Sequence, residues 1–143
     1  MVLLRESNGE RMLPIFIGLP EAKAIGLAMA GQDPPRPMTH DLLATFLGKP
    51  FSVAVEQVVV TDLRDRTFFA EVTLRGPGGI EVVSARPSDA IALAVRTGAP
   101  VLVAEEVSMR LALSHLPAMK VQIRLIHQLL RPRSRSSGPF WTR

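Results

Sequence analysis

Apolar and polar residues alternate in several short segments of the chain, a period of two that is typical of half-buried β-strands. The first two segments lie on either side of Asn8-Gly9, and Asn-Gly between apolar runs is a strong signal of a β-hairpin. A later group, joined by short turns, predicts an antiparallel meander. The expected strands are Val2–Glu6, Met12–Ile17, Val53–Thr61, Thr67–Leu74, Ile80–Ala85 and Pro100–Ala104.

Two helices are predicted between the hairpin and the meander. The first begins near Pro20, which suits a first helical turn, and Glu21 favours the positive end of the helix dipole. The second is predicted over His40–Leu47, with Thr39 as its N-cap. Its inward-facing residues are expected to be Leu42, Leu43, Phe46 and Leu47.

A third helix is predicted after the meander. It begins at Arg86–Asp89, with Pro87 in its first turn, and Gly98 can end it. Residues Ala90–Val95 are apolar on every side, so this helix is expected to be buried at the centre of the fold. The predicted order is ββ-α-α-βββ-α-β, an α+β fold with a mixed, largely antiparallel sheet.

The last quarter of the chain differs in charge from the rest. Residues 1–106 hold ten Lys and Arg against thirteen Asp and Glu, a balance of −3, whereas residues 107–143 hold seven Lys and Arg and no acid, a balance of +7. We therefore expect one domain at 1–107 and a basic C-terminal extension at 108–143. Met119–Leu130 is predicted to be a helix, and 131–138 has the composition of a disordered linker. This extension either binds nucleic-acid phosphates or has no selected role.

Composition narrows the class of protein. Cysteine is absent, which excludes disulfides, a thiolate zinc site and a cysteine nucleophile. No apolar run approaches the roughly 20 residues of a membrane span, and the first residues lack the features of a secretory signal. The sequence therefore predicts a cytoplasmic protein without a membrane partner.

No HExxH, P-loop, GxSxG or DxD motif is present, so a catalytic site would have to combine residues that are distant in the sequence. The best candidates lie at two predicted helix starts. His40 and Asp41 stand at one start, and Arg86, Ser88 and Asp89 at the other. If the two starts converge on a cleft, Arg86, Ser88 and backbone N–H groups can bind a phosphate. Asp41 and Asp89 can hold Mg²⁺ or Mn²⁺, with His40 as acid or base.

A purely structural role explains the same residues. Acids in the first turn of a helix, such as Asp41 and Asp89, complement its dipole, and Ser88 can bond locally. His40 can equally be inert. Arg36, in a loop rich in proline, either lines the cleft and contacts substrate or packs against its neighbours.

Three segments together resemble the bifunctional-nuclease (BFN) domain family, in their order and spacing, over about residues 2–107. They are Leu13–Gly18 (LPIFIG), Arg36–Leu42 (RPMTHDL) and Ser84–Ala94 (SARPSDAIALA), continuing to Gly98–Pro100. The resemblance implies an α+β fold, a nuclease that hydrolyses phosphodiester bonds in RNA and DNA, and a homodimer.

Two features depart from the family pattern. A further strand usually precedes the position of Val2, and acidic sequence usually follows the last strand, whereas this chain is basic after Glu106. The absence of a dense catalytic motif keeps a second hypothesis open, in which the domain is not an enzyme. It would then bind a small ligand, a nucleotide or a protein partner in the same cleft.

Overall fold

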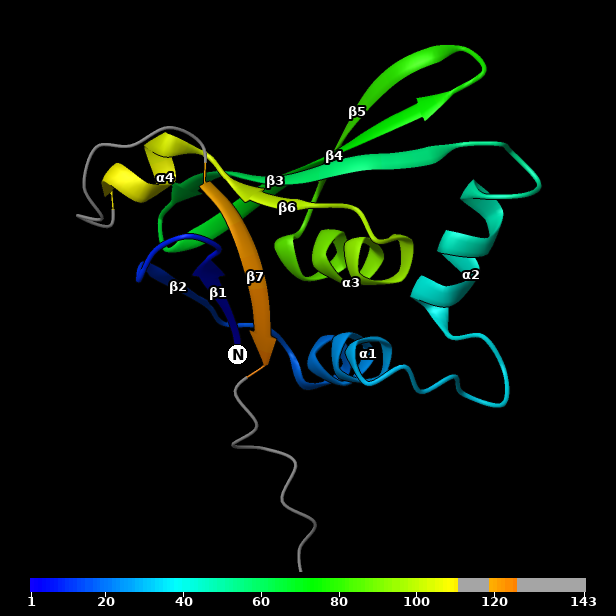
Figure 1. Cartoon of the computed structure of the whole chain (residues 1–143), viewed down its shortest axis with the longest axis horizontal. Coiled ribbons are helices and arrows are strands. Elements are labelled where there is room, and N and C mark those ends of the chain that lie inside the picture. The colour runs from blue at the N-terminus through cyan, green and yellow to red at the C-terminus, as the bar shows by residue number, and fades with distance from the viewer. Residues whose placement is uncertain (111–118, 126–143) are drawn as a thin grey trace, which may run out of the picture.

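A computed structural model describes residues 1–110 and 119–125, which form one mixed sheet with helices packed on it (Figure 1). The seven strands are β1 (Val2–Glu6), β2 (Met12–Ile15), β3 (Ala54–Arg64), β4 (Thr67–Gly76), β5 (Gly79–Ala85), β6 (Val101–Val103) and β7 (Met119–Leu125). Their order across the sheet is β2-β1-β7-β6-β3-β4-β5. Neighbouring strands are antiparallel except β3 and β6, which are parallel. The predicted α+β class and largely antiparallel sheet are confirmed.

Four helices occur in the described residues: α1 (Leu19–Met29), α2 (Thr39–Leu47), α3 (Pro87–Thr97) and α4 (Glu105–Arg110). The predicted central position of α3 is confirmed, because it packs on β3 and β4 and is flanked by α1 and α2 (Figure 1). Its residues Ala90–Ala94 are buried. Pro87 stands in its first turn, and Gly98 ends it in the left-handed conformation (φ 75°) that glycine adopts without strain.

The core lies between α3 and the sheet. Each of the two hairpin strands β1 and β2 buries one face, with Val2 and Leu4 opposite Ile15 and Leu13. The alternation that predicted these strands is thus the alternation of buried and exposed positions.

The C-terminal prediction needs correction, because residues 119–125 form the strand β7 and not a helix. In this segment apolar residues alternate with Lys120, Gln122 and Arg124. This period of two is typical of a strand, so the sequence of the segment is compatible with a strand and with a helix. Insertion between β1 and β6 satisfies the backbone groups of both strands. Residues 126–130 of the predicted helix and the predicted linker at 131–138 lie outside the described residues.

The predicted element order lacks α4 and β7, which follow β6. Strand β7 joins the β1–β2 hairpin to the rest of the sheet, so residues after 107 complete the sheet. The domain boundary at residue 107 stays a prediction.

The environment of α2 also differs from the prediction. Leu42, Leu43 and Phe46 were expected to face inward, but each is more than two-fifths exposed, and Leu47 packs partly against the core. Because the main packing contact of α2 is with α3, the amphipathic pattern here does not mark a face that lies on the sheet. The N-cap is Met38 and not Thr39, and the Met38 N–H donates to the Asp41 carboxylate at 2.8 Å.

No helix in the described ranges is long and apolar enough to cross a bilayer.

Candidate active site

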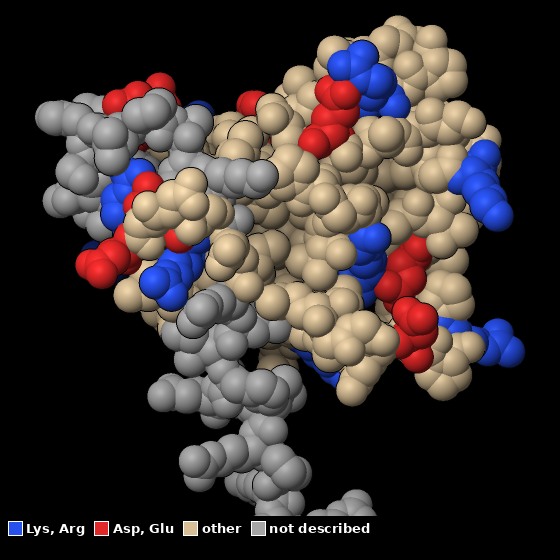
Figure 2. All heavy atoms as spheres, viewed as in Figure 1, with Lys and Arg blue, Asp and Glu red and all other residues tan. Residues whose placement is uncertain are grey.

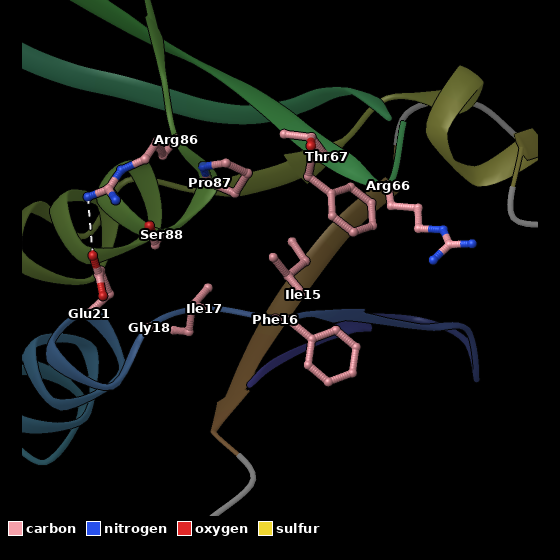
Figure 3. A pocket seen from close by; sticks show the side chains of 11 residues that line it. Ile15, Phe16, Ile17, Gly18, Glu21, Arg66, Thr67, Arg86, Pro87 and Ser88 are labelled. Carbon is pink, nitrogen blue, oxygen red and sulfur yellow. Dashed lines mark ion pairs between the residues drawn. The ribbon is translucent and has the colours of Figure 1, made fainter. Parts of the chain in front are cut away.

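A pocket of about 330 Å³ opens where the β2–α1 junction, the β3–β4 turn and the start of α3 meet (Figure 3). The β2–α1 junction contributes Ile15–Gly18, and the β3–β4 turn contributes Arg66–Phe68. Helix α3 contributes Arg86–Ser88, and α1 contributes Glu21. Three segments distant in the sequence therefore form this pocket.

The N-termini of α1 and α3 both lie at this pocket, since their N-cap residues Gly18 and Arg86 line it. The α1 end is covered by its own first turn, because a Cβ at Gly18 would lie 2.3 Å from Glu21 Oε2. Glycine at position 18 thus leaves room for the Glu21 carboxylate. At the start of α3, Pro87 has no N–H, and the Asp89 and Ala90 N–H groups donate to the Arg86 carbonyl oxygen at 3.1 Å. Within the described ranges the Ser88 N–H is therefore the backbone donor of this turn that is left for an anion.

Ser88, in the first turn of α3, presents a free hydroxyl to the pocket. The residue is 7% exposed and lines the pocket. Within the described ranges its hydroxyl has no hydrogen bond. Every fully buried side-chain oxygen or nitrogen in these ranges does have a partner, so the Ser88 hydroxyl is not fully buried. The Ser88 oxygen is therefore accessible from the pocket.

Arg86 is held by two carboxylates. Its Nε donates to Asp89 Oδ2 at 2.6 Å and its Nη2 to Asp89 Oδ1 at 3.1 Å. The same Nη2 lies 3.3 Å from Glu21 Oε1 (dashed in Figure 3). Arg86 lowers the pKa of the Asp89 carboxyl against the opposing effect of burial, and His40 lowers this pKa further. Nη1 has no acceptor in the described part of the chain, and it is free to bind an anion.

His40 extends this network to α2. Its Nε2 lies 3.0 Å from Asp89 Oδ1, and its side chain is 13% exposed. Because Asp89 is ionised and can only accept, Nε2 carries the proton and Nδ1 is the basic nitrogen. The network thus runs from Glu21 through Arg86 and Asp89 to His40, and it connects α1, α3 and α2.

Asp41 belongs to a different cluster. Its Oδ1 accepts a hydrogen bond from Arg96 Nε at 2.5 Å, and its Oδ2 accepts one from the Met38 N–H. Arg96 and then Met38 lower the pKa of the Asp41 carboxyl. Arg96 also donates to the Ala92 and Ala24 carbonyl oxygens at 2.8 and 3.1 Å, and its side chain is 8% exposed. This arginine fastens α1 and α2 to α3.

The predicted site residues therefore divide into two groups. Arg86, Asp89 and His40 form one hydrogen-bonded network, and Ser88 is in the adjoining pocket. Asp41 and Arg36 are outside it: Asp41 pairs with Arg96, and Arg36 is exposed and does not line the pocket. Their assignments as ligand and substrate contact stay predictions.

The sequence did not predict the contacts of Glu21 and Arg96 or the place of Phe16 at the pocket. Glu21 reads as an ordinary first-turn acid, and its contact with Arg86 depends on the packing of α1 against α3. Arg96 has a signal, because a charged residue near the end of an otherwise buried helix needs a partner.

The donor set does not fit a divalent cation shared by Asp41 and Asp89. Each of these carboxylates already accepts hydrogen bonds on both oxygens, and they belong to separate networks. Among the described residues, no group of three or more His, Asp or Glu side chains is placed to hold a metal.

Comparison with known proteins gives the same family as the sequence motifs. The model of the bifunctional nuclease domain family matches residues 2–115. Two uncharacterized proteins of Mycobacterium tuberculosis, MT1877 of strain CDC 1551 / Oshkosh and Rv1829 of strain ATCC 25618 / H37Rv, are each 45% identical over 107 residues. The match covers 75% of this chain and 63% of each relative, so the chain spans less than two thirds of their length.

The fold and this network define an α+β domain whose charged residues gather at helix starts beside a pocket. The family match extends over most of this chain, from β1 past α4. The chain belongs to the bifunctional nuclease domain family.

Proposed function

We propose that this domain is a nuclease that hydrolyses phosphodiester bonds in RNA and DNA. The observation that carries the proposal is the network Glu21–Arg86–Asp89–His40 beside the pocket. Family membership supports the nucleic-acid substrate class.

In this proposal the start of α3 binds the scissile phosphate. The free Nη1 of Arg86, the Ser88 hydroxyl and the Ser88 backbone N–H donate hydrogen bonds to its oxygens. Glu21 and Asp89 hold the guanidinium in position, because Arg86 donates to both of them.

The His40–Asp89 pair supplies the proton transfer. Asp89 accepts from Nε2, so Nδ1 of His40 takes a proton from the attacking water. The water oxygen bonds to phosphorus, the P–O bond to the leaving nucleoside breaks, and the proton passes to the departing oxygen. Assistance by Mg²⁺ or Mn²⁺ is a separate hypothesis that the arrangement of Asp41 and Asp89 does not favour, and no step here depends on it.

The test is cleavage of labelled RNA and DNA by purified protein and its Asp89→Ala and His40→Gln variants, with Mg²⁺, Mn²⁺ or EDTA. Loss of a general acid–base group lowers the rate by roughly a hundredfold to ten-thousandfold, and we expect that loss in both variants. Asp33→Ala is the matched control, because Asp33 is exposed and has no ion pair within the described ranges. Equal cleavage by Asp89→Ala and Asp33→Ala would overturn the proposed site, and loss of cleavage in EDTA would establish a metal.

A second function remains supported by one observation. Arg86 is already neutralised by two carboxylates, which suits a ligand-binding or partner-binding domain that performs no chemistry. Well-folded protein that binds nucleic acid or nucleotide without cleaving it would favour this function.

We further propose that the domain is a homodimer formed through β5 and α2. Strand β5 is at the edge of the sheet and exposed along nearly its whole length, with Ile80, Val82 and Val83 each about half exposed. Leu42, Leu43 and Phe46 expose further apolar surface on α2. Figure 2 shows few charged side chains between these elements. Unpaired apolar edges of this kind are typical of interfaces.

A further inference from the structure

We infer that the pocket beside α3 takes one unpaired nucleotide, so that the substrate is single-stranded nucleic acid or an unpaired end. The inference deepens the proposed function and rests on it for the nucleic-acid class. It depends on the division of the pocket into a polar end and an aromatic end (Figure 3).

The polar end suits a phosphate. Ser88 is only 7% exposed, and its hydroxyl faces the pocket without a partner in the described part of the chain. Arg86 is fixed by Glu21 and Asp89 and keeps Nη1 free. Because this hydroxyl opens to the pocket and has no protein partner in the described part of the chain, it can donate to a ligand there, and Ser88 adds a second polar contact for an anion at the start of α3.

The aromatic end suits a base. Phe16 lines the pocket, and its side chain is 83% exposed, the most exposed of the large apolar residues in the described ranges. Arg66, on the β3–β4 turn, also lines the pocket, with its guanidinium extending outward (Figure 3), and it makes no ion pair within the described ranges. An exposed ring at the rim of a pocket is a stacking platform for one base.

Size and charge favour a single nucleotide over a duplex. A volume of about 330 Å³ is near the lower end of the range of roughly 300–1,000 Å³ for small-molecule pockets, and a paired base cannot enter without leaving its helix. The formal charges of Glu21 and Asp89 balance those of Arg66 and Arg86. Binding should therefore depend on stacking and on one or two phosphates, not on a long basic track.

The first measurement is binding of short, fluorescein-labelled phosphorothioate oligonucleotides, which resist hydrolysis, by fluorescence anisotropy with the full chain. Phe16→Ala should weaken single-strand binding by about 5- to 150-fold, the fold-change that loss of one stacked base produces. Phe16→Trp should retain binding. Phe51→Ala is the matched control, since Phe51 is 63% exposed and lies outside the pocket, and thermal melting checks that all variants fold.

Salt and strandedness provide independent readouts. One or two phosphate contacts predict a slope of log K against log salt of roughly −0.7 to −1.4 for a single strand, and the matching duplex should bind at least tenfold more weakly. Equal effects of Phe16→Ala and Phe51→Ala, or equal affinity for the duplex, would overturn the inference. Phe16-dependent binding without any cleavage would sustain the inference while rejecting the proposed nuclease, so the two failures are distinguishable.

Discussion

At the scale of single residues, the same amino-acid types serve two different purposes in this domain. Asp89 and Asp41 are both acids in the first turn of a helix, and an arginine lowers the pKa of each. Asp89 pairs with Arg86, which is 67% exposed and lines the pocket, whereas Asp41 pairs with the buried Arg96. The exposure of the arginine separates a candidate site from a structural contact.

The lowered pKa of Asp89 predicts a pH dependence of stability. A folded-state pKa below the unfolded value of about 3.9 contributes stability above that pH, and the contribution is lost as pH falls through the folded pKa. We expect Asp89→Asn to be less stable than the wild type near neutral pH and the difference to shrink below about pH 4. Urea unfolding across this pH range measures it.

Urea unfolding of Asp33→Asn over the same pH range controls for general charge effects. A difference between wild type and Asp89→Asn that stays constant from neutral to acidic pH would contradict the ion pair.

Among the elements, α3 organises the site because α1 and α2 both pack against it. Arg96 fastens all three helices through the Asp41 carboxylate and the Ala24 and Ala92 carbonyl groups. The position of His40 against Asp89 therefore depends on a contact made by the next residue of α2, Asp41.

Arg96→Met should destabilise the domain strongly. Removing one partner of a buried ion pair costs about 3–5 kcal/mol, and because Asp41 is 24% exposed we expect the lower end of this range. Chemical denaturation gives the change in unfolding free energy. Arg36→Met is the control, expected within about 0.5 kcal/mol of the wild type because Arg36 is exposed; similar values for the two variants would contradict the fastening role.

At the scale of the whole molecule, the two edges of the sheet differ. Strand β2 is one edge and buries Leu13 and Ile15, whereas β5, the other edge, buries almost nothing. The apolar side chains of β5 and α2 make this end of the molecule the proposed dimer surface.

Val82→Lys tests that surface. The two-fold symmetry of a dimer would bury two lysines, and an unpaired charge at an interface costs several kcal/mol, so dimerisation should weaken by at least about tenfold. Analytical ultracentrifugation of wild type and variant measures this. Met12→Lys is the matched control, because Met12 is a half-exposed apolar residue on the opposite edge strand; a monomeric wild type would reject the proposed dimer.

Two elements could be predicted from the chain alone, because short segments carry their signals. Asn8-Gly9 identified the β1–β2 hairpin, and Pro87, Gly98 and the apolar run between them identified a buried helix, as observed in α3. These signals depend on backbone preferences and on the period of apolar residues, which a short segment carries alone. The same signals placed Arg86, Ser88 and Asp89 at a helix start, and this start was predicted to be part of the site.

Which residues and strands pair with one another depends on the packing of the whole fold. The sequence predicts a helix over residues 119–125, but in the fold this segment pairs with the edges of β1 and β6 and forms a strand. His40 meets Asp89 across 49 positions and Arg96 meets Asp41 across 55, and nothing local fixes either pair. Such contacts depend on how α1 and α2 pack on α3, because buried charges must find partners wherever packing brings them close.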